Sequence, residues 1–402
     1  MRPFGDTISL AAARTILDAT GTPISRTERI PLEQSNGRVL AREVRSTADV
    51  PPFSRAGMDG YAVRAGDTRG ATRDQPCTLT QVGTLYTGQV SPIAVRAGEC
   101  IEISTGAPMP EGADAVVMVE ETASDSGTRV RLFVEVQPQQ NVGTRGADIQ
   151  TGHIVLDAGD TINSSRLGAL AAIGASSVEV FARPRVAILS TGNEIVTPGE
   201  PLRPGEIYDI NRFTLSAVVE EHGGVAVPYP PAPDSLDALV TTLEQCLVND
   251  IVVFSGGSSV GERDLIRDAI AAKGLLLFHG IAVKPGKPTG LGVVNGKPVF
   301  AMPGYPTSCL SNAYILLVPL LRRIAGLGPQ MKRTRTVSMA QRVSSVRGRH
   351  QFFTVRIVDD KAVPAFKGSG DITSMSRADG YIEIPADVDA IDPGALVDVT
   401  LF

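Results

Sequence analysis

The chain has 402 residues, of which 43% are hydrophobic and 20% charged, and its formal net charge is −5. This is ordinary globular composition, and the length predicts two to four domains rather than a single core. The acidic balance, without a basic stripe of interleaved aromatic residues, argues against a nucleic acid partner. The sequence has no apolar run of about 18 residues and no signal-peptide pattern at its start, so we expect no membrane partner and a cytoplasmic location.

In the first 180 residues, helical patterns near both ends flank a stretch with strand patterns. Residues 9–18 predict a helix, and Asn163 with Ser164 predicts the start of another that runs through Ile173. Between them, alternating runs such as 115–119 and 130–134 predict strands. We assign 46–145 to a β-rich domain, and 1–45 with 146–180 to an N-terminal helical and linker domain.

Residues 181–327 alternate between apolar runs and amphipathic patterns. Asn211 is expected to cap one helix, Ser235 or Asp234 the next, and Pro306 to open a long helix through Leu320. Strands are expected at 185–189, 225–229, 251–254, 275–278 and 299–302. The pattern predicts a doubly wound α/β domain with a parallel sheet, in which ligands bind beyond the carboxyl ends of the strands.

A glycine-rich loop follows the strand at 251–254. Its glycines would let the backbone approach a ligand, and the next helix would present free N–H groups to an anion. Asp264, at the entry of that helix, could hold a metal beside the anion. The alternative is a glycine-rich turn whose carboxylate only caps the helix.

Other loops of the α/β domain have similar chemistry. Glu194 follows the first strand, Asp234 the second, and Lys284-Pro-Gly-Lys287 places two cations on a stiff turn. Carboxylates and lysines around glycine-rich backbone suit a phosphate with Mg²⁺, although such a lysine pair can also be a solvated turn. The four cysteines and four histidines are scattered, and we assign no role to them.

Residues 328–402 predict a C-terminal β domain. Alternation at 351–357, 381–384 and 395–399 indicates short strands. The expected fold class is therefore α/β plus β: a central doubly wound domain, a β-rich N-terminal domain and a C-terminal β-barrel-like domain.

An ordered set of motifs covers nearly the whole chain. They are Pro51-Pro-Phe53 with Met58-Asp-Gly-Tyr-Ala-Val63, Thr105-Gly-Ala-Pro-Met-Pro110, Thr191-Gly-Asn-Glu194, Ser255-Gly-Gly257 through Asp264, Lys284-Pro-Gly-Lys-Pro288 and Pro303-Gly-Tyr-Pro306. The set resembles the molybdopterin molybdenumtransferase family, that is, the bacterial MoeA type and the E domain of gephyrin.

The resemblance implies a four-domain subunit, an elongated homodimer and a Mg²⁺-dependent reaction. Adenylylated molybdopterin and molybdate would yield molybdenum cofactor and AMP. The central domain would bind molybdopterin and share the fold of molybdopterin adenylyltransferase, the expected upstream donor.

The same resemblance, carried over position by position, implies the site residues. The catalytic candidates are Asp59, Glu194, Asp234 and Asp264. Glu194 and Asp264 are the candidate metal ligands, and which carboxylate holds the metal and which orients the attacking oxygen stays open. The substrate-binding candidates are Thr105, Ser255, Gly256, Gly257, Lys284, Lys287, Pro303, Pro306, Arg349 and Ser369. Because the β-rich domain of one subunit faces the α/β domain of the other in this family, each site would combine Asp59 of one chain with Asp264 of its partner.

Two positions depart from the family pattern: Tyr305 replaces a common Asn, and Asn193 a common Asp. They leave the fine specificity open, including molybdate against tungstate, but not the reaction class. The substrate carries its own dithiolene sulfurs, so the chemistry needs no protein thiol, in agreement with the scattered cysteines. A non-catalytic scaffold and another nucleotide-dependent transferase on the same α/β domain are the alternatives.

Overall fold

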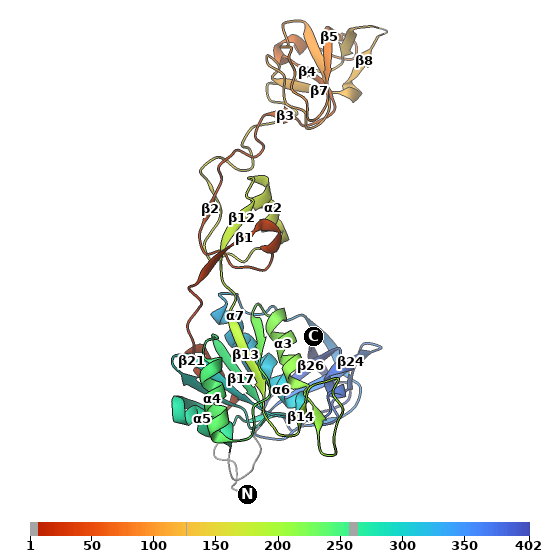
Figure 1. Cartoon of the computed structure of the whole chain (residues 1–402). Helices are drawn as coiled ribbons and strands as arrows, with labels where there is room; N and C mark the ends of the chain where they lie inside the picture. Colours follow the sequence, from red (N-terminus) through yellow and green to blue (C-terminus); the bar gives the residue numbers. More distant parts are fainter. Residues whose placement is uncertain (1–6, 126, 257–263) are drawn as a thin grey trace. The chain divides into compact units, whose positions relative to one another are not determined.

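A computed structural model describes residues 7–125, 127–256 and 264–402. The chain forms two compact units, Arg29–Val180 and Met1–Glu28 with Phe181–Phe402. Figure 1 labels their elements.

The larger part of unit Arg29–Val180 is a six-stranded sheet in the order β7-β4-β6-β5-β9-β8. Every residue of β4 is buried, because Tyr61 and Val63 enter one apolar cluster and Ala62 enters another. The strands of this sheet are β4 (Gly60–Val63), β5 (Cys77–Leu85), β6 (Glu99–Ile103), β7 (Ala115–Met118), β8 (Thr122–Ser124) and β9 (Arg129–Leu132).

The rest of this unit packs around helix α2 (Ser164–Ala172). Asn163 caps the helix as expected, since its side chain accepts the N–H of Arg166, and Leu170 is fully buried beside Leu40 and Ile162. Short strand pairs surround the helix: β1 (Thr27–Pro31) with β12 (Ser177–Phe181), and β2 (Val44–Arg45) with β11 (Ile154–Leu156). A third pair, β3 (Arg55–Ala56) with β10 (Val142–Gly143), adjoins the six-stranded sheet.

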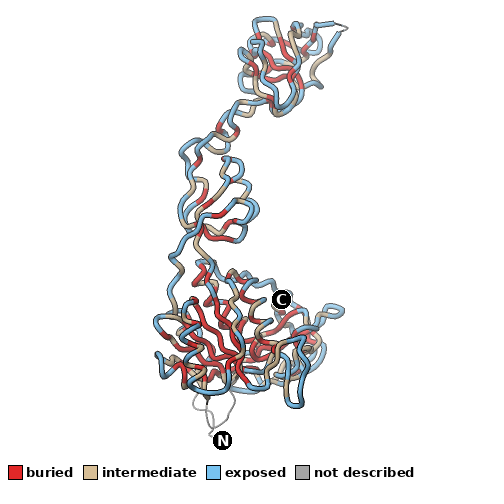
Figure 2. The backbone as a smooth tube through the Cα atoms, in the orientation of Figure 1, coloured by how far each residue is buried: buried red, intermediate tan, exposed pale blue. Residues whose placement is uncertain are grey.

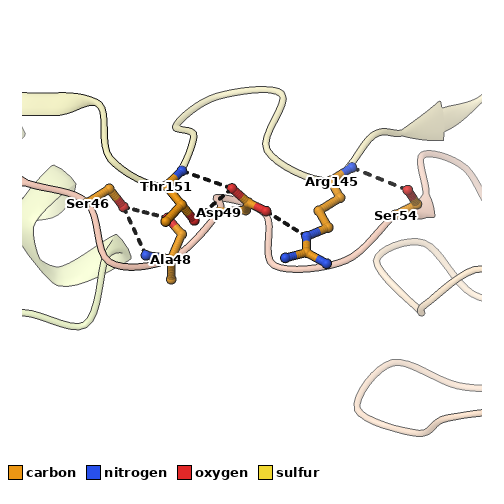
Figure 3. Close-up of polar contacts among 6 residues, drawn as sticks. All are labelled: Ser46, Ala48, Asp49, Ser54, Arg145 and Thr151. Carbon is orange, nitrogen blue, oxygen red and sulfur yellow. Dashed lines mark hydrogen bonds and ion pairs between the residues drawn. The ribbon is translucent and has the colours of Figure 1, made fainter.

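Two crossings of the chain run side by side where the β-rich part begins and ends (Figure 3). The Asp49 carboxylate accepts the Thr151 N–H at 2.9 Å and its hydroxyl at 3.0 Å, and Arg145 Nε at 2.6 Å. These bonds hold the pKa of Asp49 below its ordinary value, the Thr151 N–H contributing most. The domain boundaries at 45–46 and 145–146 lie near these crossings and remain a prediction.

The second unit contains a six-stranded sheet in the order β16-β13-β17-β21-β20-β18. Registers align the ends of β13 and β17 (Ser190 with Ser255) and of β17 and β21 (Ser255 with Met302). The strands are β13 (Arg185–Ser190), β16 (Val225–Pro228), β17 (Ile251–Ser255), β18 (Leu275–His279), β20 (Gly290–Val294) and β21 (Lys297–Met302). The pair β14 (Ile195–Val196) and β15 (Ile207–Tyr208) lies in the loop after β13.

Helices pack on both faces of this sheet, and much of the backbone of this unit is coloured as buried in Figure 2. The helices α4 (Leu236–Cys246) and α5 (Leu265–Lys273) form one apolar cluster with Leu189 and Phe254. On the other face lie α1 (Leu10–Asp18), α3 (Asn211–Glu221), α6 (Pro306–Asn312) and α7 (Val318–Ile324). This confirms the doubly wound arrangement.

Three local expectations need correction. The sheet is mixed rather than fully parallel, because β20 forms an antiparallel hairpin with β21 through Asn295-Gly296, both at positive φ, and β18 pairs antiparallel with β20. Asn211 does not cap α3: the Asp209 carboxylate accepts the Arg212 N–H there instead. The helix expected from Pro306 to Leu320 is α6, a π-helical turn at 313–317 and α7, and Pro319 lacks the N–H that a regular helix would need.

The C-terminal strands form a closed barrel. The order β24-β25-β22-β28-β26 returns to β24, which confirms the barrel-like expectation, and β19 joins at its edge. The elements are β19 (Val283–Lys284), β22 (Thr334–Met339), β24 (His350–Val358), β25 (Lys361–Pro364), α8 (Thr373–Ser376), β26 (Gly380–Ile384) and β28 (Leu396–Leu401), with β23 (Val343–Ser344) paired to β27 (Ala390–Ile391). In the described parts of both units, no helix is long and apolar enough to cross a membrane.

Candidate functional site

The loops that follow β13, β16, β17 and β21 meet at one edge of the sheet. The parallel registers place the carboxyl ends of these strands side by side. Asn193 Oδ1 accepts the N–H of Asp234 at 3.4 Å, which joins the loops after β13 and β16. This edge is where an open α/β sheet binds ligands.

Glu194 and Asp234 are exposed at this edge. The Glu194 carboxylate folds back over Gly192: a Cβ there would lie 2.6 Å from both carboxylate oxygens. Any larger residue at 192 would therefore displace the carboxylate. Both acids are placed to meet a ligand from solvent.

Ser255 lies at the end of β17 and is 1% exposed. Ser190 Oγ donates its proton to Asp209 Oδ1 at 2.8 Å, so in the 3.3 Å contact between the two serine hydroxyls Ser255 must be the donor. Gly256 follows at φ +107°, and a Cβ there would meet the Thr191 carbonyl oxygen at 2.3 Å. The backbone therefore requires glycine at 256. Gly257 lies outside the described residues.

Asp264 begins α5 as expected. Its Oδ1 accepts the Arg267 N–H at 3.1 Å, and its Oδ2 lies 2.8 Å from His279 Nε2. Both side chains are largely buried, with 9% of Asp264 and 15% of His279 exposed. The sequence gives His279 no role, because nothing in one sequence shows that the end of β18 lies against the start of α5.

The lysine turn is built by a buried network rather than left as a solvated loop. Lys284 and Lys287 are half-buried. Between them Gly286 has φ +95°, and its carbonyl accepts Asn312 Nδ2 at 2.8 Å. A Cβ at 286 would lie 2.2 Å from that nitrogen. The turn is therefore fixed against α6.

The C-terminal barrel brings two further candidates toward these loops. β19 pairs in parallel with β24, and His350 N donates to the Ala282 carbonyl at 2.8 Å, so Arg349 lies beside the strand that carries Lys284. On the other loop, Thr307 N donates to the carbonyl of Ser369 at 3.1 Å. This bond places Ser369 beside the Pro303–Pro306 segment, whose Tyr305 is 66% exposed.

Asp59 and Thr105 lie in the other unit and pair with each other. Asp59 Oδ1 accepts the Thr105 N–H at 2.6 Å and its hydroxyl at 2.9 Å. These bonds, the backbone one first, hold the pKa of the exposed Asp59 below its ordinary value. The turn depends on Gly60, where a Cβ would lie 1.9 Å from the Val117 carbonyl oxygen.

The donor set suits Mg²⁺ only in partnership with a substrate. Across the described ranges, no cluster of three or more His, Cys, Asp or Glu side chains is arranged to hold a metal. Mg²⁺ commonly binds one or two carboxylates together with substrate phosphates and water. Glu194 and Asp264 fit that pattern, and the buried Asp264 has one oxygen committed to the helix cap.

Comparison with known proteins decides the family. The MoeA N-terminal region (domain I and II) matches residues 8–174, the probable molybdopterin binding domain matches 187–323, and the MoeA C-terminal region (domain IV) matches 336–402. Molybdopterin molybdenumtransferase 2 of Mycobacterium tuberculosis is 33% identical over 92% of this chain and 94% of its own. The chain belongs to the MoeA family.

Other relatives agree. The molybdopterin molybdenumtransferase of Haemophilus influenzae is 30% identical over 94% of each chain. The crystal structure of the MoeA protein of molybdopterin biosynthesis from Pyrococcus horikoshii has a TM-score of 0.85 and 40% identity, covering 98% of this chain and 99% of its own. The resemblance stated from the motifs is confirmed, and with it the expectation that the chain is a transferase of molybdenum cofactor biosynthesis.

Proposed function

We propose that this protein inserts molybdate into adenylylated molybdopterin, with release of AMP and formation of molybdenum cofactor, in a Mg²⁺-dependent reaction. The observation that carries the proposal is that, in a chain of this family, carboxylate-bearing loops follow neighbouring strands of the α/β sheet and the lysine turn is fixed against α6. A scaffold without chemistry has no need for a half-buried lysine pair held by a glycine that no other residue can replace.

The proposed role of each site residue follows from its charge. The bond to adenylate is a phosphoanhydride: water supplies the oxygen to one phosphorus, and AMP leaves with the bridging oxygen. Lys284 and Lys287 offset the negative charge that gathers on the phosphoryl oxygens. Gly256 and the start of α5 let backbone N–H groups approach an anion. Bound Mg²⁺ would supply further charge neutralisation through Glu194 and Asp264.

The exposed Asp234 and the ionised Asp59 remain as orienting groups. A carboxylate accepts hydrogen bonds, so each would hold an attacking water or a substrate N–H or O–H. Thr105, which donates two hydrogen bonds to Asp59, fixes that carboxylate. Pro303 and Pro306 stiffen the loop beside Ser369, and Arg349 adds a cation next to the lysine strand.

We also propose the assembly and its setting. The working form would be a cytoplasmic homodimer that receives its substrate from a molybdopterin adenylyltransferase, without nucleic acid or membrane.

The test is reconstitution of a cofactor-free molybdoenzyme. Purified protein with adenylylated molybdopterin, Mg²⁺ and molybdate should restore its activity and release AMP. Absence of both products would reject the proposal. Binding of AMP without any turnover would favour a scaffold that still binds the nucleotide.

A further inference from the structure

A buried contact joins Asp264 to a histidine that the proposed function does not use. Asp264 Oδ2 lies 2.8 Å from His279 Nε2, and only 9% and 15% of the two side chains are exposed. Among the residues that the structure describes, Oδ2 makes no hydrogen bond of ordinary geometry, and its close polar contact is with His279 Nε2. A carboxylate oxygen is the acceptor, so a hydrogen bond at this contact requires the proton on Nε2.

We propose that His279 is a positioning residue that fixes the carboxylate of Asp264 at the entry of α5; the proposal rests on the function proposed above. Oδ1 is already held by the Arg267 N–H at 3.1 Å. With one oxygen on the helix and the other against His279, the carboxylate has one orientation. Residues that fix catalytic groups in this way commonly act from just outside the substrate contacts.

The backbone just after His279 also contacts the lysine turn. His279 ends β18 opposite Gly290 of β20, where a Cβ would lie 3.1 Å from the ring carbon Cδ2. Glycine at 290 therefore leaves room for the ring. Just beyond, Ile281 N donates to the Lys287 carbonyl at 2.9 Å. His279 thus links the carboxylate at α5 to the base of the lysine turn.

The expected effect of this contact is to hold the Asp264 carboxylate in a fixed position relative to the two lysines of the turn. The carboxylate and the lysine turn come from separate loops, so their relative position depends on the contacts between those loops. A displacement of a reacting group by about 1 Å can lower the rate about 100-fold. Removal of the imidazole should let the carboxylate rotate while the helix cap remains. Substrate affinity, which depends on many contacts, should change little.

The kinetic test uses two variants and a matched control. His279→Leu removes the donor, and His279→Gln keeps a side-chain N–H donor of similar reach. We expect His279→Leu to lower kcat about 10-fold to 100-fold with KM within about 3-fold of the wild type, and His279→Gln to recover most of kcat. His222→Leu, a second buried histidine, at the end of α3 and 8% exposed, should leave kcat unchanged.

A spectroscopic test needs no turnover. The chain has only four histidines, so ¹⁵N-histidine spectra can be assigned by single replacements. Asp264→Asn should shift the ring signals of His279 and leave the other three in place. If those signals do not move, the contact is absent and the proposal fails.

The remaining outcomes separate this inference from the proposed function. Near-normal kcat in His279→Leu, or a lower melting temperature with unchanged kcat per folded protein, would overturn the positioning role while the function stands. Equal kcat in His279→Leu and His279→Gln, both low, would overturn the role of the donor. If the wild type releases no AMP, the proposed function fails, and the spectroscopic test alone decides whether His279 holds Asp264.

Discussion

Replacement of Asp264 separates a structural carboxylate from a chemical one. The side chain caps α5 through a 3.1 Å bond to the Arg267 N–H. Loss of such a cap to alanine costs about 1 kcal/mol. For a unit of this size that is a fall in melting temperature of about 2–4 °C. Asparagine caps a helix about as well as aspartate, so Asp264→Asn should cost only a few tenths of a kcal/mol.

Turnover should respond differently. Both variants lack the negative charge that faces His279, so both should lose AMP release, whatever their stability. Ser9→Ala is the matched control, because Ser9 caps α1 through a 3.1 Å bond from the Ala12 N–H and has no part in the site. It should lower the melting temperature by a similar amount and keep full turnover.

The assay measures melting temperature and AMP release on the same preparations. If Asp264→Asn retains near-normal turnover, Asp264 is only a helix cap and the site assignment is wrong. If Asp264→Ala is inactive but Ser9→Ala is equally inactive, the loss comes from instability and the reasoning is also refuted.

Three other replacements test separate parts of the account. Gly286→Ala should abolish AMP release, because a Cβ there would lie 2.2 Å from Asn312 Nδ2; normal turnover would show that the lysine turn is not part of the site. Contacts with His350, offset in part by burial, and with Lys332 and Arg14 lower the pKa of Glu383 from 4.5 to about 2. Because the folded pKa is the lower one, Glu383 stabilises the fold above pH about 4.5 and this is lost as pH falls toward 2, by at most about 3 kcal/mol. Acid unfolding of Glu383→Gln should therefore be shallower over that range, and an unchanged pH profile would contradict the contact. Finally, co-refolded Asp59→Ala and Asp264→Ala chains should recover about a quarter of wild-type AMP release if sites are shared between subunits, because about half the dimers are mixed and each carries one intact site; no recovery in confirmed mixed dimers would reject sharing.

Much of the fold could be predicted from helix-capping residues and apolar runs in the sequence. Ser235, Asn163 and Asp264 cap the helices that their positions predict, and each does so through an N–H three residues on. The strands of the parallel part appear where apolar runs are bounded by glycine, proline or polar residues. These features depend on neighbours in sequence, which is why one sequence is enough to find them.

Contacts between segments that are far apart in the chain could not be predicted from the sequence. Asn295-Gly296 is a hairpin-turn signal in the sequence, but the strand before it, β20, is not among the strands that the apolar runs predict. For Asp209 and His279 the sequence contains no such local signal. Their importance comes from Ser190 and Asp264, which approach them only after the sheet has formed.

The family motifs located the candidate residues, and the structure supplies their physical support. Gly256 and Gly286 are required by close backbone and side-chain approaches that no pattern reveals. The roles given to the site residues stay predictions until they are measured.

The most direct test of the central claim is stoichiometry. In one sample with adenylylated molybdopterin, Mg²⁺ and limiting molybdate, AMP released and molybdenum inserted should rise together, one for one, and both should stop when molybdate or Mg²⁺ is left out. AMP release that continues at full rate without molybdate, with no metal inserted, would show a hydrolase and contradict the proposed function.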